Sequence, residues 1–486
     1  MTAKAIMVLG TTSGAGKSWL TTALCRYYAR LGLKVAPFKA QNMSNNARVV
    51  DGGEIGSAQY FQSLAANAVP EVRMNPLLLK PERDTHSQVI LLGQVNDALT
   101  HAPWRDRSER VWPTIQKALN ELMAENDVVV IEGAGSPAEI NLKANDIVNM
   151  RVAVAANAAC LLVTDIDRGG AFAHLYGTFA LLPEDEQALI KGFVLNKFRG
   201  DASLLAPGPE MLQEMTGVPV VATLPMWWQH GLPEEDGVFD DRSTASGAVT
   251  TTIAVIAYPR ISNLDEFQAL KNVPGVRLKW VRSPSEIIDA DWVILPGSKH
   301  TSGDLAWLRA QGLDAAIATH AAQGKAVLGI CGGLQMLGEA LIDMNQIDDK
   351  FGNNGPGLGL LPLVTNFEIA KTVQHRHTQF GKLAGLWSKL SDVTVAGYEI
   401  HHGQTAQHTA MAKAGDVAVA VLPDALGWQN PAGNVLGLYL HGMFEDPRVL
   451  QSLFGASTPT LDSVFDGLAD YIAQHFETDF LDSLIR

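Results

Sequence analysis

The sequence predicts an α/β protein with two doubly wound domains in series. Short, continuous apolar runs alternate with longer amphipathic stretches along most of the 486 residues. Such runs are typical of strands covered on both faces, as in a parallel sheet with helical crossovers. The pattern stops near Pro225, in a stretch rich in Trp, Asp, Glu, Ser and Gly, and a second strand–helix series follows. We therefore expect one parallel sheet in each half of the chain.

The predicted elements divide the chain into two domains, a linker and a tail. The first series has a strand at 5–9, a helix at 18–31 and strands at 128–131, 160–164 and 192–195; the second has strands at 253–257, 292–295, 326–330, 417–421 and 435–440. The Gly- and Asn-rich segment 343–378 is predicted to be mostly loop. The last 36 residues have apolar positions at helical spacing. The predicted divisions are a first domain at 1–230, a linker at 231–250, a second domain at 251–450 and a helical tail at 451–486, whose packing partner stays open.

Composition argues against several classes of protein. Acidic residues outnumber basic ones, 51 to 37, for a net charge of -14, so a strongly basic nucleic-acid-binding protein is not expected. Three cysteines cannot build a disulfide framework, which favours a reducing cytoplasm. The chain has no apolar run of about 18 residues, so no membrane span is expected. The N-terminus also lacks the pattern of a signal peptide. The oligomeric state stays open.

A Gly-rich segment at 10–18 joins the first predicted strand to the first predicted helix and indicates nucleotide binding. Its sequence is Gly-Thr-Thr-Ser-Gly-Ala-Gly-Lys-Ser. Small residues such as Gly14 and Gly16 let backbone N–H groups converge on phosphate oxygens at a helix N-terminus. Lys17 would then reach the terminal phosphates and Ser18 the Mg²⁺. The first Gly lies one residue earlier than in the standard spacing. A strand–helix turn without a ligand is the weaker alternative, because strand, Gly-Lys-Ser and helix all agree.

Polar residues follow three further strands of the first domain. Glu132 ends one strand before a run of small residues, where a carboxylate can face a nucleotide-bound Mg²⁺. A solvated strand end is the alternative. Asp165 and Asp167 end the next strand and could bind a metal-bound water or the substrate, or cap the following turn. Asn196 follows another strand, at a position where such folds often contact the nucleotide base.

Cys331 lies in Gly-Ile-Cys-Gly-Gly-Leu-Gln, directly after the strand predicted at 326–330. This is the cysteine version of the G-x-S-x-G elbow, in which a tight turn exposes the nucleophile near backbone N–H donors. Gly332, next to it, and Gly297, after another strand, are the predicted oxyanion donors. A buried structural cysteine is the alternative, and this alternative fits Cys25 and Cys160 better.

A cysteine nucleophile needs a base, and His441 is the predicted one. It follows a predicted strand in the same domain and precedes a glycine. His401 and His402, in Tyr-Glu-Ile-His-His-Gly, are the alternatives.

Taken together, these motifs resemble those of known families. The C-terminal half resembles class I glutamine amidotransferases, which implies that Cys331 is the nucleophile and His441 the base. The N-terminal half resembles the dethiobiotin synthetase type of P-loop fold, whose loop is similarly offset. With the Gln-Asn-Met-Ser-Asn-Asn run at 41–46, nearly the whole chain resembles the cobyric acid synthase family. Further matching segments lie at 37–40, 74–81 and 87–90.

The resemblance implies a two-site enzyme of cobalamin biosynthesis. It would use ATP, Mg²⁺ and glutamine to amidate the b, d, e and g carboxylates of a corrinoid polycarboxylate, adenosylcobyrinic acid a,c-diamide. Lys39 would be a second phosphate-facing lysine, with a surface lysine as the alternative. A local basic site is expected around Lys17 and Lys39, and Lys80, Arg83 or Arg168 could extend it.

One position departs from the amidotransferase pattern. Many class I amidotransferases carry His-x-Glu, in which the Glu orients the His, but here Met443 stands in that place. Either a Cys–His dyad acts alone or Glu445, two residues further on, orients His441.

Two other functions remain as alternatives. The chain could be a cobyrinic acid a,c-diamide synthase or another ATP-dependent amidoligase of the same architecture. It could also be a non-enzymatic P-loop regulatory ATPase with an inactive amidotransferase domain. Such regulators usually carry an extra Lys early in the loop, where this chain has Thr11, Thr12 and Ser13. The intact cysteine elbow also argues against an inactive domain.

Overall fold

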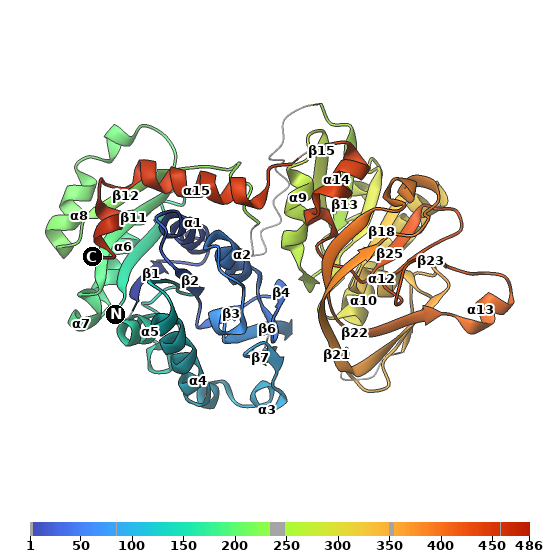
Figure 1. Cartoon of the computed structure of the whole chain (residues 1–486), viewed down its shortest axis with the longest axis horizontal. Helices are drawn as coiled ribbons and strands as arrows, with labels where there is room; N and C mark the ends of the chain where they lie inside the picture. The colour runs from blue at the N-terminus through green and yellow to red at the C-terminus, as the bar shows by residue number, and fades with distance from the viewer. Residues whose placement is uncertain (1–2, 84, 234–247, 349–353, 457) are drawn as a thin grey trace.

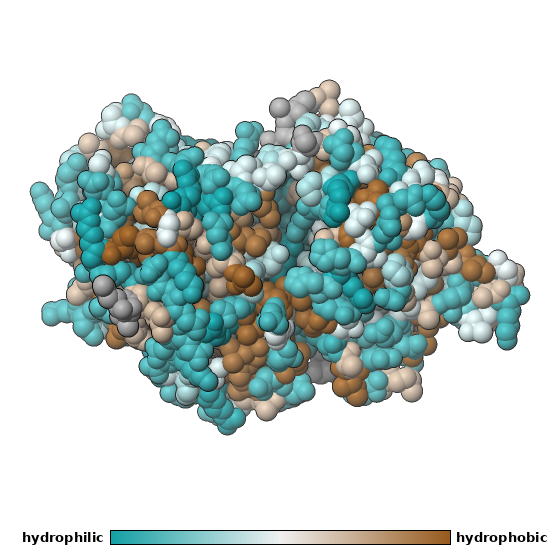
Figure 2. Space-filling model, in the orientation of Figure 1, coloured by the Kyte–Doolittle hydropathy of each residue, from teal (hydrophilic) through white to brown (hydrophobic). Residues whose placement is uncertain are grey.

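The computed structural model contains the two expected α/β domains, which lie side by side (Figure 1). It describes residues 3–83, 85–233, 248–348, 354–456 and 458–486. Most of the linker predicted at 231–250 lies outside these residues. Hydrophilic side chains cover much of the face in Figure 2, and apolar side chains on this face gather where the two domains meet. Among the described residues, no helix is long and apolar enough to cross a membrane.

The N-terminal domain is built on a six-stranded sheet in the order β12-β11-β10-β1-β9-β2. All neighbouring strands are parallel, as predicted from their continuous apolar runs. Residues at their carboxyl ends therefore meet along one edge. The strands are β1 (Lys4–Gly10), β2 (Val35–Phe38), β9 (Val128–Glu132), β10 (Ala159–Asp165), β11 (Ile190–Phe198) and β12 (Val220–Pro225). The main helices are α1 (Lys17–Arg30), α2 (Ser57–Ala65), α4 (Trp104–Glu125), α5 (Met150–Ala156), α6 (Ala171–Ala180) and α8 (Gly208–Thr216).

Short strands between β2 and α4 form the side of the N-terminal domain that faces the C-terminal domain (Figure 1). One sheet has the order β3-β6-β7-β8, and β4 and β5 form a separate antiparallel pair. Their bounds are β3 (Gln41–Met43), β4 (Ala47–Val50), β5 (Gly53–Gly56), β6 (Leu77–Arg83), β7 (His86–Leu91) and β8 (Gln94–Val95). The Gln-Asn-Met-Ser-Asn-Asn run therefore ends at the domain boundary, directly before β4.

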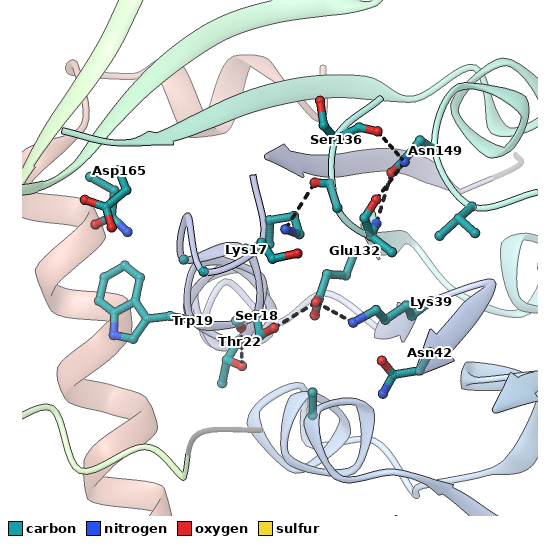
Figure 3. A pocket seen from close by; sticks show the side chains of 18 of the residues that line it. Lys17, Ser18, Trp19, Thr22, Lys39, Asn42, Glu132, Ser136, Asn149 and Asp165 are labelled. Atoms are coloured by element: carbon teal, nitrogen blue, oxygen red, sulfur yellow. Dashed lines mark hydrogen bonds and ion pairs between the residues drawn. The ribbon is translucent and has the colours of Figure 1, made fainter. Parts of the chain in front are cut away.

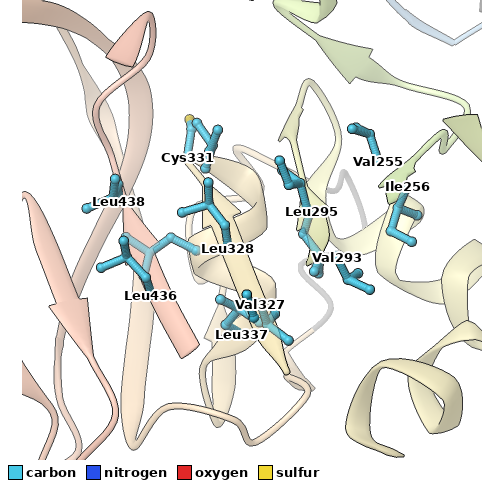
Figure 4. Packing of buried hydrophobic residues seen from close by; sticks show 14 of the residues in the cluster. Val255, Ile256, Val293, Leu295, Val327, Leu328, Cys331, Leu337, Leu436 and Leu438 are labelled. Atoms are coloured by element: carbon cyan, nitrogen blue, oxygen red, sulfur yellow. The ribbon is translucent and has the colours of Figure 1, made fainter. Parts of the chain in front are cut away.

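The C-terminal domain contains a seven-stranded sheet in the order β15-β13-β16-β18-β25-β24-β23. Its first five strands are parallel and its last two join antiparallel. The strands are β13 (Thr251–Ile256), β15 (Val276–Val281), β16 (Trp292–Leu295), β18 (Ala326–Ile330), β23 (Val419–Leu422), β24 (Gly427–Gln429) and β25 (Val435–Leu438). The main helices are α10 (Thr301–Ala310), α11 (Leu313–Ala322), α12 (Gly332–Leu337) and α14 (Pro447–Phe454). Buried Leu and Val side chains of β16, β18 and β25 pack together directly below Cys331 (Figure 4).

The prediction of a loop at 343–378 is wrong for the second half of this segment, which forms a strand. A 17-residue strand, β21 (Leu363–Gln379), pairs antiparallel with β22 (Thr394–Gln407). On its other side β21 pairs parallel with β19 (Ala340–Ile342), which in turn pairs antiparallel with β20 (Gly355–Pro356). Many β21 side chains are polar and at least partly exposed on both faces, so the apolar alternation that marks a half-buried strand is missing. Backbone pairing with β22 holds this strand in place. Residues 349–353 of the predicted loop lie outside the described residues.

The tail forms helices and packs on the N-terminal domain. After α14 the chain returns as α15 (Leu461–His475), which lies against α1 (Figure 1), and then forms α16 (Phe480–Ser483). Apolar side chains of α15 such as Phe465 and Leu468 join the core under α1. Arg26 Nε also donates to Asp466 Oδ1 at 2.7 Å. The chain therefore begins and ends in the same domain, and the tail spans the boundary between the two.

Candidate active sites

The predicted phosphate loop connects β1 to α1 in the conformation its glycines allow. Gly14 and Gly16 have φ of 72° and 101°, which other residues rarely adopt. A Cβ at Gly16 would overlap Asn196, whose Nδ2 donates to the Ala15 carbonyl at 2.9 Å. Lys17 is buried, and its Nζ donates to the carbonyls of Thr12 at 3.0 Å and of Gly135 at 3.3 Å. The loop is thus held from β11, and Asn196 lies beside it.

Glu132 is the centre of a polar cluster at the end of β9 (Figure 3). Its Oε1 accepts from Ser18 Oγ and from Lys39 Nζ, both at 2.8 Å, and its Oε2 accepts from Gln62 Nε2 at 2.6 Å. Burial by itself would raise the pKa of Glu132, but Lys39, Gln62 and Ser18 lower it below its ordinary value. An ionised carboxylate therefore lies beside the P-loop hydroxyl. Both are hard oxygen donors, the kind that Mg²⁺ prefers.

Lys39 is not a surface lysine, and the structure adds Gln62, which the sequence reasoning missed. Lys39 directly follows β2 and is 6% exposed. Gln62 comes from α2, outside every motif singled out in the sequence, so no local pattern marks it.

A cavity of about 840 Å³ surrounds the phosphate loop. Arg168 lines it, as predicted for the basic site, and Tyr471 of α15 also reaches its wall. Asp165 lies in the same cavity and accepts from Lys197 Nζ at 3.2 Å. The prediction that Lys80 extends this basic site is wrong, because Lys80 Nζ donates to Glu54 Oε2 at 2.6 Å in a different cavity. The side chain of Arg83 lies outside the described part of the chain. Other lining residues are Trp19, Met43, Asp167, Trp227 and Trp228.

Cys331 lies in a strained turn at the end of β18 (Figure 4). Its backbone has φ 52° and ψ -105°, a conformation that costs roughly 1–3 kcal/mol. The following glycines are needed for close packing, since a Cβ at Gly332 would lie 2.8 Å from the Ser298 nitrogen and one at Gly333 would overlap the Leu295 carbonyl. This is the geometry of a nucleophile elbow, as predicted. Cys25 and Cys160, by contrast, are fully buried, and burial raises the pKa of both thiols.

His441 follows β25 and is also buried, at 1% exposure. Its Nδ1 lies 3.1 Å from Glu266 Oε1, and Glu266 Oε2 accepts from the Gly442 nitrogen at 2.9 Å. Burial lowers the pKa of His441, but Glu266 and Cys331, with which the ring also interacts, together raise it to about 10. Glu266 therefore favours the protonated imidazole.

The acid beside His441 is Glu266, which neither sequence alternative named. Glu445, the alternative orienting residue, instead accepts from Arg48 Nη1 at 2.9 Å. A Cys–His pair without an acid is excluded as well, because Glu266 contacts both the His441 ring and the next backbone nitrogen. The only sequence signal for Glu266 is the acidic pair Asp265-Glu266 before a buried aromatic residue.

The two alternative histidines point elsewhere. The two ring nitrogens of His401 lie 2.9 Å from Glu399 Oε2 and 2.8 Å from the Gly403 carbonyl. His402 Nδ1 lies 3.1 Å from the Glu368 carbonyl, and burial lowers the pKa of His402 to about 4. Both residues line the cavity that contains Cys331, but each ring is engaged by another group.

Gly297 and Gly332, the predicted oxyanion donors, lie beside the two reactive side chains. Gly297 belongs to β17 (Gly297–Ser298), paired with β14 (Ile261–Ser262), and a Cβ there would lie 2.9 Å from His441 Cε1. Gly332 begins α12 directly after Cys331. Their donor roles stay predictions.

A second cavity, of about 1030 Å³, lies between the two domains. Cys331, Gln335 and Lys371 line it from the C-terminal domain, and Glu54 and Lys80 from the N-terminal domain. Glu54 is fully buried and pairs with both Lys80 and Lys371. Burial would raise the pKa of Glu54, but the two lysines lower it to about 2. The Cys331 thiol therefore lies in a cavity that extends to the N-terminal domain and contains the Glu54–Lys80 and Glu54–Lys371 ion pairs.

A phosphate loop beside a buried carboxylate and a strained cysteine elbow beside a Glu-paired histidine define a glutamine amidotransferase joined to a P-loop nucleotide-binding domain. Comparisons with known families agree. Residues 6–234 match the CobQ/CobB/MinD/ParA nucleotide binding domain, and residues 252–449 match the CobB/CobQ-like glutamine amidotransferase domain.

The chain belongs to the cobyric acid synthase family. It is 79% identical to the cobyric acid synthase of Polaromonas naphthalenivorans (strain CJ2) over the full length of both chains. It is also 74% identical to that of Variovorax paradoxus (strain S110), again over the full length of both.

Proposed function

We propose that this chain is a glutamine-dependent amidoligase that converts the b, d, e and g carboxylates of adenosylcobyrinic acid a,c-diamide into amides, using ATP. The observation that carries the proposal is the presence of both complete sites in one chain of this family: Lys17, Ser18 and Glu132 in one domain, and Cys331 and His441 in the other. A cytoplasmic location stays a prediction, supported by three free cysteines.

In the C-terminal domain, Cys331 Sγ attacks the side-chain amide carbon of glutamine. His441 gives a proton to the departing ammonia, and water then releases glutamate from the thioester. Glu266 stabilises the imidazolium and fixes the ring through Nδ1, so that the other ring nitrogen faces the reaction. Backbone N–H groups near Gly297 and Gly332 stabilise the oxyanion.

In the N-terminal domain, a substrate carboxylate attacks the γ-phosphoryl group of ATP, which gives an acyl phosphate and ADP. Ammonia then displaces phosphate to form the amide. Lys17 and Lys39 stabilise the negative charge of the transferring group. Mg²⁺ would be held by Ser18 and Glu132 together with the phosphates, and would neutralise phosphate charge. Among the described residues, no group of three or more His, Cys, Asp or Glu forms a metal site, which fits a metal bound largely by substrate.

Mass spectrometry of the corrinoid product tests the proposal. After incubation with ATP, Mg²⁺ and glutamine, the a,c-diamide should gain four amides, with glutamate released. A protein that adds amides only to cobyrinic acid at a and c would be the diamide synthase instead. Absence of glutamine hydrolysis with every corrinoid offered would indicate the regulatory ATPase.

Replacing Glu266 by Gln should slow glutamine-driven synthesis by about 10- to 100-fold, the cost typical of removing a charged group that orients a reactive histidine. The pH profile should also change. Because Glu266 helps to raise the pKa of His441 to about 10, removing its charge lowers that pKa, and the imidazolium is lost at a lower pH. The alkaline limb of glutamine hydrolysis should therefore move to lower pH. An unchanged limb would show that Glu266 does not govern the protonation of His441.

Removing divalent metal with a chelator should stop synthesis with either glutamine or ammonium salt, and added Mg²⁺ should restore both. The reason is that the carboxylate of Glu132 and the hydroxyl of Ser18 are placed to bind a cation next to the phosphates. Amide formation measured with each nitrogen source is the readout. Full activity in metal-free buffer would contradict the assigned metal ligands.

A further inference from the structure

Arg48 is a buried cation of the N-terminal domain that pairs with carboxylates of the C-terminal domain. It lies in β4, at the edge that faces β22 in Figure 1. Its side chain is 2% exposed, and its partners are Asp265 and Glu445 of the other domain. Arg48 lines neither the cavity around the phosphate loop nor the cavity that contains Cys331.

The contacts of Arg48 fix two carboxylates close to His441. Nη1 donates to Glu445 Oε2 at 2.9 Å and Nη2 to Glu445 Oε1 at 2.6 Å, while Nη2 also pairs with Asp265. Such a two-point contact sets orientation as well as charge. Asp265 directly precedes Glu266, the residue that contacts the His441 ring. Arg48 therefore holds the backbone neighbour of the acid beside the histidine.

The residues just before Arg48 hold the same segment. Asn46 Oδ1 accepts from the Leu264 nitrogen at 3.0 Å, and the Ala47 carbonyl accepts from Asn263 Nδ2 at 2.8 Å. Asn263 Nδ2 also donates to Tyr398 OH at 2.6 Å. Three consecutive residues of the N-terminal domain thus bind residues 263–265.

Tyr398 connects this contact to His441 by a second route. Its ring lies 5.4 Å from the His441 ring in a stacked arrangement, and the two residues exchange backbone hydrogen bonds. The Arg48 guanidinium lies 5.1 Å from the centre of the same tyrosine ring and 4.9 Å from that of Phe61 in α2. The guanidinium therefore contacts both Tyr398 and α2, and it is linked to His441 indirectly, through Tyr398 and through the Asp265–Glu266 segment.

We propose that Arg48 is a positioning residue for glutamine hydrolysis, which keeps Glu266 against His441 by holding Asp265 and Glu445. The proposal rests on the proposed roles of Cys331 and His441. Without the cation, the buried Asp265 and Glu266 and the partly exposed Glu445 would be three carboxylates close together, and their mutual repulsion would move the 263–267 segment. The ammonia-producing site is thus completed by the domain that uses the ammonia.

A double-mutant cycle tests this inference in the full-length protein. Arg48→Met should lower kcat/KM for glutamine by about 10-fold or more, with ammonium-driven synthesis unchanged. If Arg48 acts through Glu266, the Arg48→Met/Glu266→Gln double variant should be no slower than Glu266→Gln alone, within about twofold. Arg48→Lys, which keeps the charge but not the two-point contact, should recover part of the loss.

Arg73→Met is the matched control, because Arg73 pairs with Glu71 and Glu125 inside the N-terminal domain and should leave both activities unchanged. If Arg48→Met does not fold, Glu445→Gln takes its place in the cycle and should give a smaller loss that also vanishes in the Glu266→Gln background. The inference would be overturned if the losses of the two single variants multiplied in the double variant. It would also be overturned if Arg48→Met lowered ammonium-driven synthesis by the same factor, or if it caused no loss at all. An active Cys331→Ala protein would instead contradict the proposed function itself.

Discussion

Replacing Cys331 by Ala should abolish glutamine-driven amidation, with a loss of at least about 10³-fold, while ammonium-driven amidation stays within about twofold of the original rate. The thiol is the group that bonds to the glutamine carbon, so no neighbouring side chain can replace it. The ligase reaction needs only ammonia, and its residues lie in the other cavity. Amide formation measured with each nitrogen source separates the two activities.

The loss of the thiol should not disturb the fold strongly. Cys331 Sγ lies 3.6 Å from the Ile400 carbonyl and interacts with His441, and the strained turn depends on the glycines around the cysteine. Cys160→Ala is the matched control, because it removes a buried thiol from a strand interior and should keep both activities. If Cys331→Ala retained glutamine-driven synthesis, the assignment of the elbow would be wrong.

Unlike Cys331→Ala, the Lys17→Ala variant should lose activity with both nitrogen sources, by about 10²-fold or more. Lys17 Nζ is held by the Thr12 and Gly135 carbonyls at the mouth of the phosphate loop, where the transferring phosphoryl group gains negative charge. Without this cation the acyl phosphate forms slowly, whichever way ammonia is supplied. ADP release and amide formation, measured together, should fall by the same factor.

The glutamine site should remain intact in the Lys17→Ala protein. Alkylation of Cys331 by a thiol-reactive glutamine analogue should proceed at the original rate. Lys191→Ala is the matched control, since Lys191 is exposed at the start of β11, where it donates to the Ala188 carbonyl, and it does not line the nucleotide cavity. Ammonium-driven synthesis at the original rate in Lys17→Ala would rule out the phosphate loop as the ligase site.

Parts of the two sites that depend on a few consecutive residues were predicted, and contacts between residues far apart in the chain were not. The phosphate loop and the cysteine elbow were both predicted because each is a short turn whose backbone needs glycine at defined positions. The partner of His441 was not predicted, because Glu266 lies 175 residues away in the chain. Glu445, the nearby acid left open as an alternative, instead binds Arg48, a cation from the other domain.

The same distinction applies to the fold. Buried parallel strands such as β9 and β10 were predicted from their apolar runs, since both faces of these strands are covered. The long strand β21 was missed because its side chains are polar and partly exposed, so only pairing with β22 makes it a strand. The helical spacing of the tail predicted α15, but not that it would pack against α1.

The sequence alone determined the two α/β domains, the phosphate loop and the cysteine elbow, because these depend on local backbone geometry and on continuous apolar runs. Tertiary structure alone decided which charges meet: Glu266 with His441, Arg48 with Asp265 and Glu445, and Lys80 with Glu54 rather than with the nucleotide site. The physical reason is that a buried ion pair joins segments that are far apart in the chain, and its partners are set by how whole domains pack. The residues that carry the chemistry can therefore be predicted from the sequence, whereas the residues that position them can be identified only in the folded structure.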